Sequence, residues 1–147
     1  MFEPSEFAVL SRQLLLGSLD ATFDGRGTSD ECRLRAALGR AYYALYLATR
    51  AVIVRKHGIP SRSINHGVLH TYLRHSKAGR EVQALGHELR RLCALRQQAD
   101  YEMVPTREWQ LKLTDRVYVD FMTKQAIASA SALDRLDFGP VAELFGR

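Results

Sequence analysis

Cysteine is scarce in this chain: Cys32 and Cys93 are the only two, and they form neither a Cys-x-x-Cys pair nor a Cys/His metal-binding spacing. We therefore expect reduced thiols and a cytoplasmic protein. Long hydrophobic runs are also missing, because no apolar stretch reaches the roughly 18 residues that a membrane span needs. The chain starts with Glu3 and Glu6 where a signal peptide would be basic. These absences exclude a disulfide scaffold and predict no membrane association.

The short motifs of several common enzyme classes are missing too. The chain has no glycine-rich phosphate loop, no His-Glu-x-x-His and no Gly-x-Ser-x-Gly. His66 and His70 are one helical turn apart, a spacing that can bind a metal ion. No carboxylate or cysteine accompanies that pair in a metal-binding pattern, so we expect neither a metal site nor a cofactor.

Composition is ordinary for a globular protein, whereas the charge is less so. The 147 residues are 46% hydrophobic and 25% charged, and the length predicts one domain over 1–147. Lys and Arg number 21 against 16 Asp and Glu, which gives a net charge of +5 and a pI of about 9.5. This balance favours an anionic partner such as a nucleic acid. Many soluble proteins are equally basic without such a partner, so charge alone leaves the question open.

Apolar residues follow a helical spacing along almost the whole chain, with no strand-like alternation, internal repeat or low-complexity linker. Long helices are predicted at about 5–21, from a cap at Thr28 or Ser29 to about 57, at about 78–103 and at about 107–136, and a short helix at about 66–75. Residues 24–27 are expected to form a turn, and Gly139 begins a short tail. We therefore predict an all-α protein, an antiparallel bundle of four long helices plus one short helix.

The second long helix carries the strongest apolar signal, because every residue from 41 to 48 is apolar or aromatic. A helix that is apolar all round needs neighbours on more than one side, so we expect it at the centre of the bundle. Tyr42, Tyr43 and Tyr46 are expected to lie mostly in the core, with one hydroxyl reaching a buried charge.

The helix expected at 78–103 has an arginine on its apolar face. Seven residues in a 3-4-3-4 spacing share this face: Val82, Leu85, Leu89, Leu92, Arg96, Ala99 and Met103. Taking a charge into a helical interface costs several kcal/mol of folding free energy unless the charge is paired. Arg96 is therefore expected to pair with Asp100, one turn on, or with a carboxylate of a facing helix, and it marks a candidate site.

Three segments around this arginine carry a family resemblance. They are Arg40-Ala41-Tyr42-Tyr43-Ala44-Leu45-Tyr46, His66-Gly67-Val68 and Leu95-Arg96-Gln97-Gln98-Ala99-Asp100-Tyr101. In this order they resemble the small bacterial HEPN-type proteins, over about 34–103. The resemblance implies an all-α HEPN bundle that is frequently dimeric. It also implies RNA cleavage, bacterial defence, or a toxin–antitoxin pair whose second member is a minimal nucleotidyltransferase.

One motif departs from the ribonuclease members of that group, which carry an arginine followed after four to six residues by a histidine. Asp100 and Tyr101 follow Arg96, and every histidine precedes it. In the family, the histidine is assigned acid–base chemistry on the RNA and the arginine stabilises charge on the phosphate. Tyrosine is a poor base at neutral pH, because its ordinary pKa is near 10. A literal Arg-x6-His at Arg80 and His87 lies well upstream, and we interpret it as accidental.

The first functional hypothesis is an RNA-binding or RNA-processing HEPN protein, a toxin or defence component with metal-independent endoribonuclease activity. The expected residues are Arg96, Tyr101 and His66 as catalytic groups, with Arg40, Tyr43 and Asp100 as binding or structural support. Arg96, Tyr101 and Arg40 would contact phosphate in a cleft shared by two subunits, and His66 would be the acid–base group if it reaches them. The alternative for Arg40 is a side chain whose stem covers apolar surface.

The second hypothesis is a non-catalytic helical module. Arg96 and Asp100 would then form a buried polar lock, closed off by apolar side chains. The apolar helix faces would serve homodimerisation or the docking of a nucleotidyltransferase-type antitoxin. In the related toxin–antitoxin pairs, the partner modifies a tyrosine near the HEPN arginine, which makes Tyr101 the residue of interest here.

Overall fold

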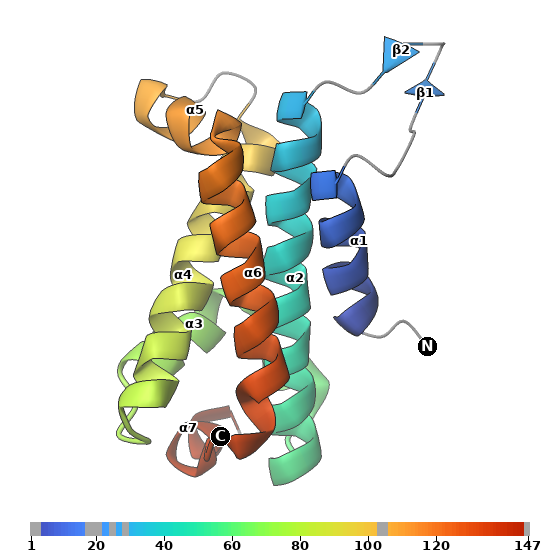
Figure 1. Cartoon of the computed structure of the whole chain (residues 1–147). Helices are drawn as coiled ribbons and strands as arrows, with labels where there is room; N and C mark the ends of the chain where they lie inside the picture. Colours follow the sequence, from blue (N-terminus) through green and yellow to red (C-terminus); the bar gives the residue numbers. More distant parts are fainter. Residues whose placement is uncertain (1–3, 17–21, 24–25, 28–29, 103–105, 146–147) are drawn as a thin grey trace.

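The computed structural model describes residues 4–16, 22–23, 26–27, 30–102 and 106–145. Its long and medium helices are α1 (Pro4–Leu16), α2 (Asp30–His57), α3 (His66–Arg74), α4 (Arg80–Tyr101) and α6 (Arg116–Ala132) (Figure 1). The shorter elements are α5 (Arg107–Thr114), α7 (Gly139–Phe145), the 3₁₀ turns η1 (Ser61–Ser63) and η2 (Leu133–Arg135), and the strands β1 (Thr22–Phe23) and β2 (Arg26–Gly27).

The helices form an antiparallel bundle, as the sequence predicts, although their number differs from the predicted four long helices and one short helix. α1 and α4 run in one direction, and α2 and α6 run in the other (Figure 1). α2 lies between α1 and α6. α2 packs against α1, α4 and α6, while the short α3 packs on α4. The all-α class is therefore confirmed. No helix in the described part of the chain is long and apolar enough to cross a bilayer.

α2 is the central element of the core, which confirms the interpretation of its apolar segment. Leu38, Ala41, Leu45 and Ile53 have no exposed surface, and Tyr42 and Tyr46 are almost as deeply buried. α1 is held against it by Leu15 and by a hydrogen bond of 2.8 Å that the buried Ser11 hydroxyl donates to the Ala37 carbonyl. Because α2 touches every long helix, residues on its several faces can meet residues from all of them.

The helix expected at 107–136 is divided at Asp115 into α5 and α6. The Asp115 backbone is extended, and its Oδ1 accepts hydrogen bonds from the amides of Val117 and Tyr118, as an N-cap does. The break shifts the helical phase, so that Val119, Met122 and Ala126 are buried. Val117 and Phe121, which continue the spacing from Leu113, are 80% and 59% exposed.

The tail expected from Gly139 is helical instead. In α7, Val141, Ala142 and Phe145 are buried, and the Phe145 ring lies 5.0 Å from that of Tyr72 on α3. Pro140 suits the first turn of a helix, because the missing N–H has no partner there in any case. α7 therefore closes one end of the bundle.

Several expectations concern residues outside the described ones. These residues are the part of the expected helix 5–21 that follows Leu16, the expected caps Thr28 and Ser29, and Met103 at the end of the apolar stripe. Of the turn expected at 24–27, residues 24–25 also lie outside the described ones, and Arg26–Gly27 form strand β2 instead. β2 pairs with β1 as an antiparallel strand in the register Thr22 to Gly27 and Phe23 to Arg26.

Candidate functional site

Arg96 lies in the apolar seam of α4, where the spacing predicts it. Its described neighbours on the stripe are all buried: Val82, Leu85, Leu89, Leu92 and Ala99. Only 15% of the Arg96 side chain is exposed. The cost of holding a guanidinium there has to be offset by partners.

Three side chains supply those partners. Arg96 Nε donates to Asp100 Oδ2 at 2.9 Å, which confirms the expected pair one turn apart. Arg96 Nη2 donates to the hydroxyls of Tyr43, at 2.9 Å, and Tyr101, at 2.6 Å. The guanidinium carbon also lies 5.2 Å and 4.9 Å from the centres of those two rings. Tyr43 is therefore the core tyrosine whose hydroxyl reaches a charge.

Gly39 lets α4 approach α2 closely at this point. A Cβ on Gly39 would lie 3.2 Å from Asp100 Oδ1, which is tighter than most such contacts. The small residue thus leaves room for the carboxylate that orients Arg96.

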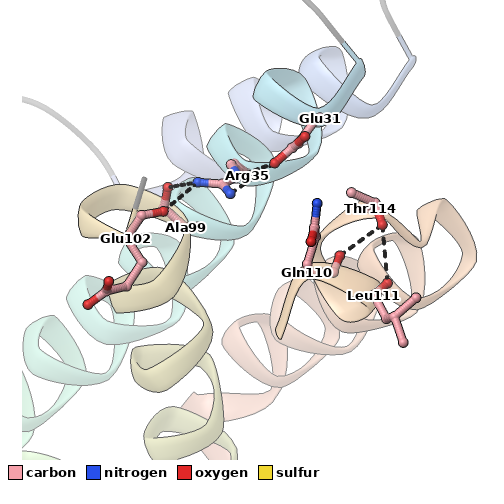
Figure 2. Close-up of polar contacts among 7 residues, drawn as sticks. All are labelled: Glu31, Arg35, Ala99, Glu102, Gln110, Leu111 and Thr114. Atoms are coloured by element: carbon pink, nitrogen blue, oxygen red, sulfur yellow. Dashed lines mark hydrogen bonds and ion pairs between the residues drawn. The ribbon is translucent and has the colours of Figure 1, made fainter. Parts of the chain in front are cut away.

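Arg35 fastens the last turn of α4 to α2. Its Nη1 donates to the carbonyl of Glu102 at 2.9 Å and lies 3.5 Å from that of Ala99, while its Nε donates to Glu31 at 3.0 Å (Figure 2). The last carbonyls of a helix have no partner within the helix, and a cation suits that end of the helix dipole. Arg35 therefore fixes the turn that carries Asp100 and Tyr101.

His66 enters the site from α3, of which it is the first residue. Asn65 caps this helix by accepting a hydrogen bond of 3.1 Å from the Val68 amide. The His66 ring stacks on Tyr46 with 3.8 Å between centroids, and its Nδ1 lies 2.8 Å from the Tyr42 hydroxyl. The ring is held in place although the residue is exposed to solvent.

The surroundings of His66 favour the neutral form of its imidazole. Stacking on Tyr46 buries the ring in part and thereby lowers its pKa, and the positive charges of Arg96 and Arg50 lower the pKa further. Burial raises the pKa of the Tyr42 hydroxyl, which also lies beside Cys93, so Tyr42 stays a phenol. A neutral histidine beside a permanent phenol can exchange a proton at its outer nitrogen, Nε2.

Tyr42 and Tyr43 join the arginine and the histidine into one cluster. The Tyr43 ring is edge-on to the His66 ring at 5.8 Å, and its hydroxyl binds Arg96. The Arg96 guanidinium is also 6.0 Å from the centre of the Tyr42 ring. Side chains from α2, α3 and α4 thus meet at one place, and five of the six residues singled out from the sequence belong to it.

Arg40 is the one that lies apart. Its guanidinium is 5.7 Å from the Phe7 ring of α1, and Phe7 in turn stacks on Tyr43 at 5.6 Å. In the described part of the chain it has no ion pair. Arg40 therefore borders the cluster as a half-buried cation over an aromatic ring, in agreement with the alternative of a stem that covers apolar surface.

The cluster faces solvent on one side. Tyr101 is 66% exposed, the Asp100 side chain is 33% exposed, and His66 is exposed as well. Arg96 and Tyr101 are therefore not closed off by apolar side chains. The arrangement can accept a phosphate on Arg96 with a titratable ring close by.

Comparison of the chain with models of protein families, with curated proteins and with solved structures found no match. Among the described residues, no group of three or more His, Cys, Asp or Glu gathers as metal ligands would. The geometry of the cluster therefore carries the functional argument.

The sequence did not predict a functional role for four residues of the site: Arg35, Tyr42, Tyr46 and Arg50. The two tyrosines look like core residues in the sequence, and their role depends on where α3 places His66. Arg35 is four residues after Glu31, a spacing that signals a helix-surface ion pair but gives no sign of the carbonyls of α4.

Proposed function

We propose that this is a cytoplasmic HEPN-type protein that binds and cleaves RNA, as a toxin or defence component. The observation that supports the proposal best is the meeting of Arg96 and His66 at one solvent-facing cluster, from helices that the sequence separates. In this proposal, Arg96 on α4 takes the role of the family's arginine, and His66 on α3 takes the role of its histidine. This arrangement replaces the Arg-x4–6-His pattern that the chain lacks.

In this proposal, Arg96 binds the scissile phosphate. Its Nη1 makes no hydrogen bond to any described residue, so it is free to donate to a phosphate oxygen. Asp100, Tyr43 and Tyr101 hold the rest of the guanidinium in a fixed orientation. A preoriented cation stabilises the charge that develops on the phosphorus oxygens in the transition state.

His66 acts as the base that the cleavage step requires. In the tautomer whose Nδ1–H donates to the Tyr42 oxygen, Nε2 is free to take the proton of the ribose 2′-hydroxyl. The 2′-oxygen then bonds to phosphorus, and the bond from phosphorus to the 5′-oxygen breaks. Tyr101 donates its proton to that leaving oxygen, and Arg96 stabilises the resulting phenolate. His66 returns the proton to Tyr101 afterwards.

Partners follow from the same proposal. The exposed apolar residues Leu16, Val117 and Phe121 give a homodimer a surface on which to form. The second candidate function, a module docked to a nucleotidyltransferase-type antitoxin, rests on Tyr101, whose exposed hydroxyl beside Arg96 is accessible to a modifying enzyme.

The test is to incubate the purified protein with total RNA beside the Arg96→Ala and Arg90→Ala variants. Arg90 is an exposed arginine of the same helix, so its replacement removes one positive charge without touching the cluster. We expect the native protein and Arg90→Ala to cleave equally and Arg96→Ala to lose at least 100-fold in rate. Equal cleavage by all three, or none by the native protein, would contradict the proposal.

A further inference from the structure

A second polar site lies between α4 and α6, away from the cluster. The N-terminal half of α4 and the C-terminal half of α6 share one end of the bundle (Figure 1). α4 packs on α2 and α3, α6 packs mainly on α2, and the two helices make few contacts with each other. A cavity of about 290 Å³ remains between them, with Leu85, Leu133 and Leu136 as apolar lining and Glu88, Ser129 and Arg135 among its polar lining.

Glu88 is the unusual member of this lining, because it is a carboxylate with only 8% of its surface exposed. Its Oε2 accepts a hydrogen bond of 2.7 Å from the Ser129 hydroxyl. Its Oε1 is buried and has no hydrogen-bond partner among the described residues. A buried carboxylate oxygen without a partner costs folding free energy. Stability alone therefore does not account for a glutamate at this position.

The cation whose charge acts on Glu88 does not pair with it. Arg91 is three residues on, yet it donates to Gln125 Oε1 at 3.0 Å. Burial raises the pKa of Glu88, and the Ser129 hydrogen bond and the charge of Arg91 offset that rise only in part. Among the described residues, Glu88 forms no ion pair at the wall of the cavity.

We infer that the cavity binds a small organic cation, an ammonium group on a short apolar chain. The ammonium would pair with the Glu88 carboxylate at the cavity wall, and the three leucines would cover the carbon chain. Glu88 and Glu81 line the cavity against the single guanidinium of Arg135, so the lining favours a positive ligand. A cavity of about 290 Å³ has room for about ten water-sized groups. This inference does not depend on the proposed RNA chemistry.

Titration of the ¹⁵N-labelled full chain with n-hexylamine at pH 7, followed by NMR, tests the inference. Hexan-1-ol, which has the same chain and no charge, is the matched ligand. We expect hexylamine to shift the backbone amides of Leu85, Glu88 and Ser129 saturably, and hexanol to shift them at least tenfold less at equal concentration. Saturable shifts of equal size with both ligands, or none with either, would overturn the inference.

Two variants distinguish binding of the amine by Glu88 from its general attraction to negative charge on the protein. Glu88→Gln keeps the side-chain shape and removes the charge, and it is expected to weaken hexylamine binding at least tenfold. Glu108→Gln removes an exposed charge from α5 and is expected to bind as the native protein does. Equal binding by Glu88→Gln and the native chain would contradict the assignment. The amine and alcohol titrations of the native protein decide the question even if a variant does not fold.

A lysine side chain of a protein could present the same ammonium. The tripeptide acetyl-Gly-Lys-Gly-amide, titrated in the same way, separates the two sources. Tighter binding of the peptide than of hexylamine would assign the cation to a protein partner, and the reverse order to a free amine. Either order supports an ammonium site at Glu88.

Discussion

Arg96 donates a hydrogen bond of 2.9 Å to the hydroxyl of Tyr43, which lies 53 residues earlier in the chain. This bond joins the two helices, α2 and α4, that carry the most recognisable sequence segments. It also links the guanidinium to the aromatic cluster that holds His66. The candidate site therefore depends on packing between helices, since no single helix contains it.

Tyr43→Phe tests that link directly. Removing the hydroxyl leaves Arg96 Nη2 with Tyr101 alone, so we expect about 1 kcal/mol less stability and at least a tenfold loss of RNA cleavage. Urea unfolding and cleavage assays measure both quantities. Tyr72→Phe is the control, because the Tyr72 ring packs against Phe145 and its hydroxyl makes no hydrogen bond to a described residue. Equal cleavage by the two variants would argue against a role for Tyr43.

The ionisation of His66 is open to a separate test. Its pKa is lowered by burial of the ring and by the charges of Arg96 and Arg50. An NMR titration of the ring is therefore expected to give a pKa below the ordinary 6.5, and a higher value in Arg96→Ala. A value at or above 6.5 in the native protein would contradict the proposed neutral base.

Stability depends on pH through the same group. Because the folded state holds His66 with the lowered pKa, the unfolded chain binds more protons between that pKa and 6.5. Stability from this source is fully present above pH 6.5 and is lost as the pH falls through the folded pKa. His70 has a pKa shifted in the same direction by burial and by Arg74 and Arg90. His66→Gln is therefore expected to reduce, and not abolish, the gain in urea midpoint between pH 5.5 and 7.5.

Gly86 sets how closely α3 and α4 approach. A Cβ there would lie 2.5 Å from the Arg74 amide nitrogen and 2.8 Å from Leu73 Cβ, which leaves no room for it. Gly86→Ala is expected to cost about 1–3 kcal/mol of stability, although alanine is the better helix former. Gly67→Ala, whose Cβ would meet nothing closer than 3.6 Å, is expected to be neutral or to gain up to about 1 kcal/mol. Unfolding in urea measures both, and equal stability of the two variants would contradict the packing described.

Arg35 provides the remaining prediction about the fold. Arg35→Ala removes the donor to the carbonyls of Glu102 and Ala99 (Figure 2), so the last turn of α4 is expected to exchange its amide hydrogens at least tenfold faster. Stability is expected to fall by about 1–2 kcal/mol. Arg33→Ala is the control, because Arg33 pairs with Asp30 at the start of the same helix. Unchanged exchange at Asp100 and Tyr101 in Arg35→Ala would show that the clamp does not hold the site.

The fold was predictable from the sequence where one periodic pattern runs through an element. The uniform apolar character of 41–48 identified the central helix, and the stripe from Val82 to Ala99 placed Arg96 in a seam. The division at Asp115 was not predicted, because the apolar spacing on both sides of it is helical and hides the N-cap that separates the two helices. The phase change it causes explains why Phe121 is exposed.

The site was predictable only in part, for a related reason. The pair of Arg96 and Asp100 is local, since it needs one turn of a single helix. The contacts of His66 with Tyr42 and Tyr46 depend on how the loop after α2 returns α3 to that helix. No spacing along the chain contains that information. α7 escaped prediction because a short helix that begins with glycine and proline resembles a tail.

The central claim is that Arg96 and His66 act as one site on RNA, and single-turnover cleavage of a short single-stranded RNA tests it most directly. The native protein, Arg96→Ala, His66→Ala and the double variant are compared at equal concentration. Groups that act as a unit are not additive. We predict that each single replacement loses at least 100-fold in rate and that the double variant is no slower than the slower single one. A double variant that loses the product of the two single losses, or single variants that cleave at the native rate, would contradict the account.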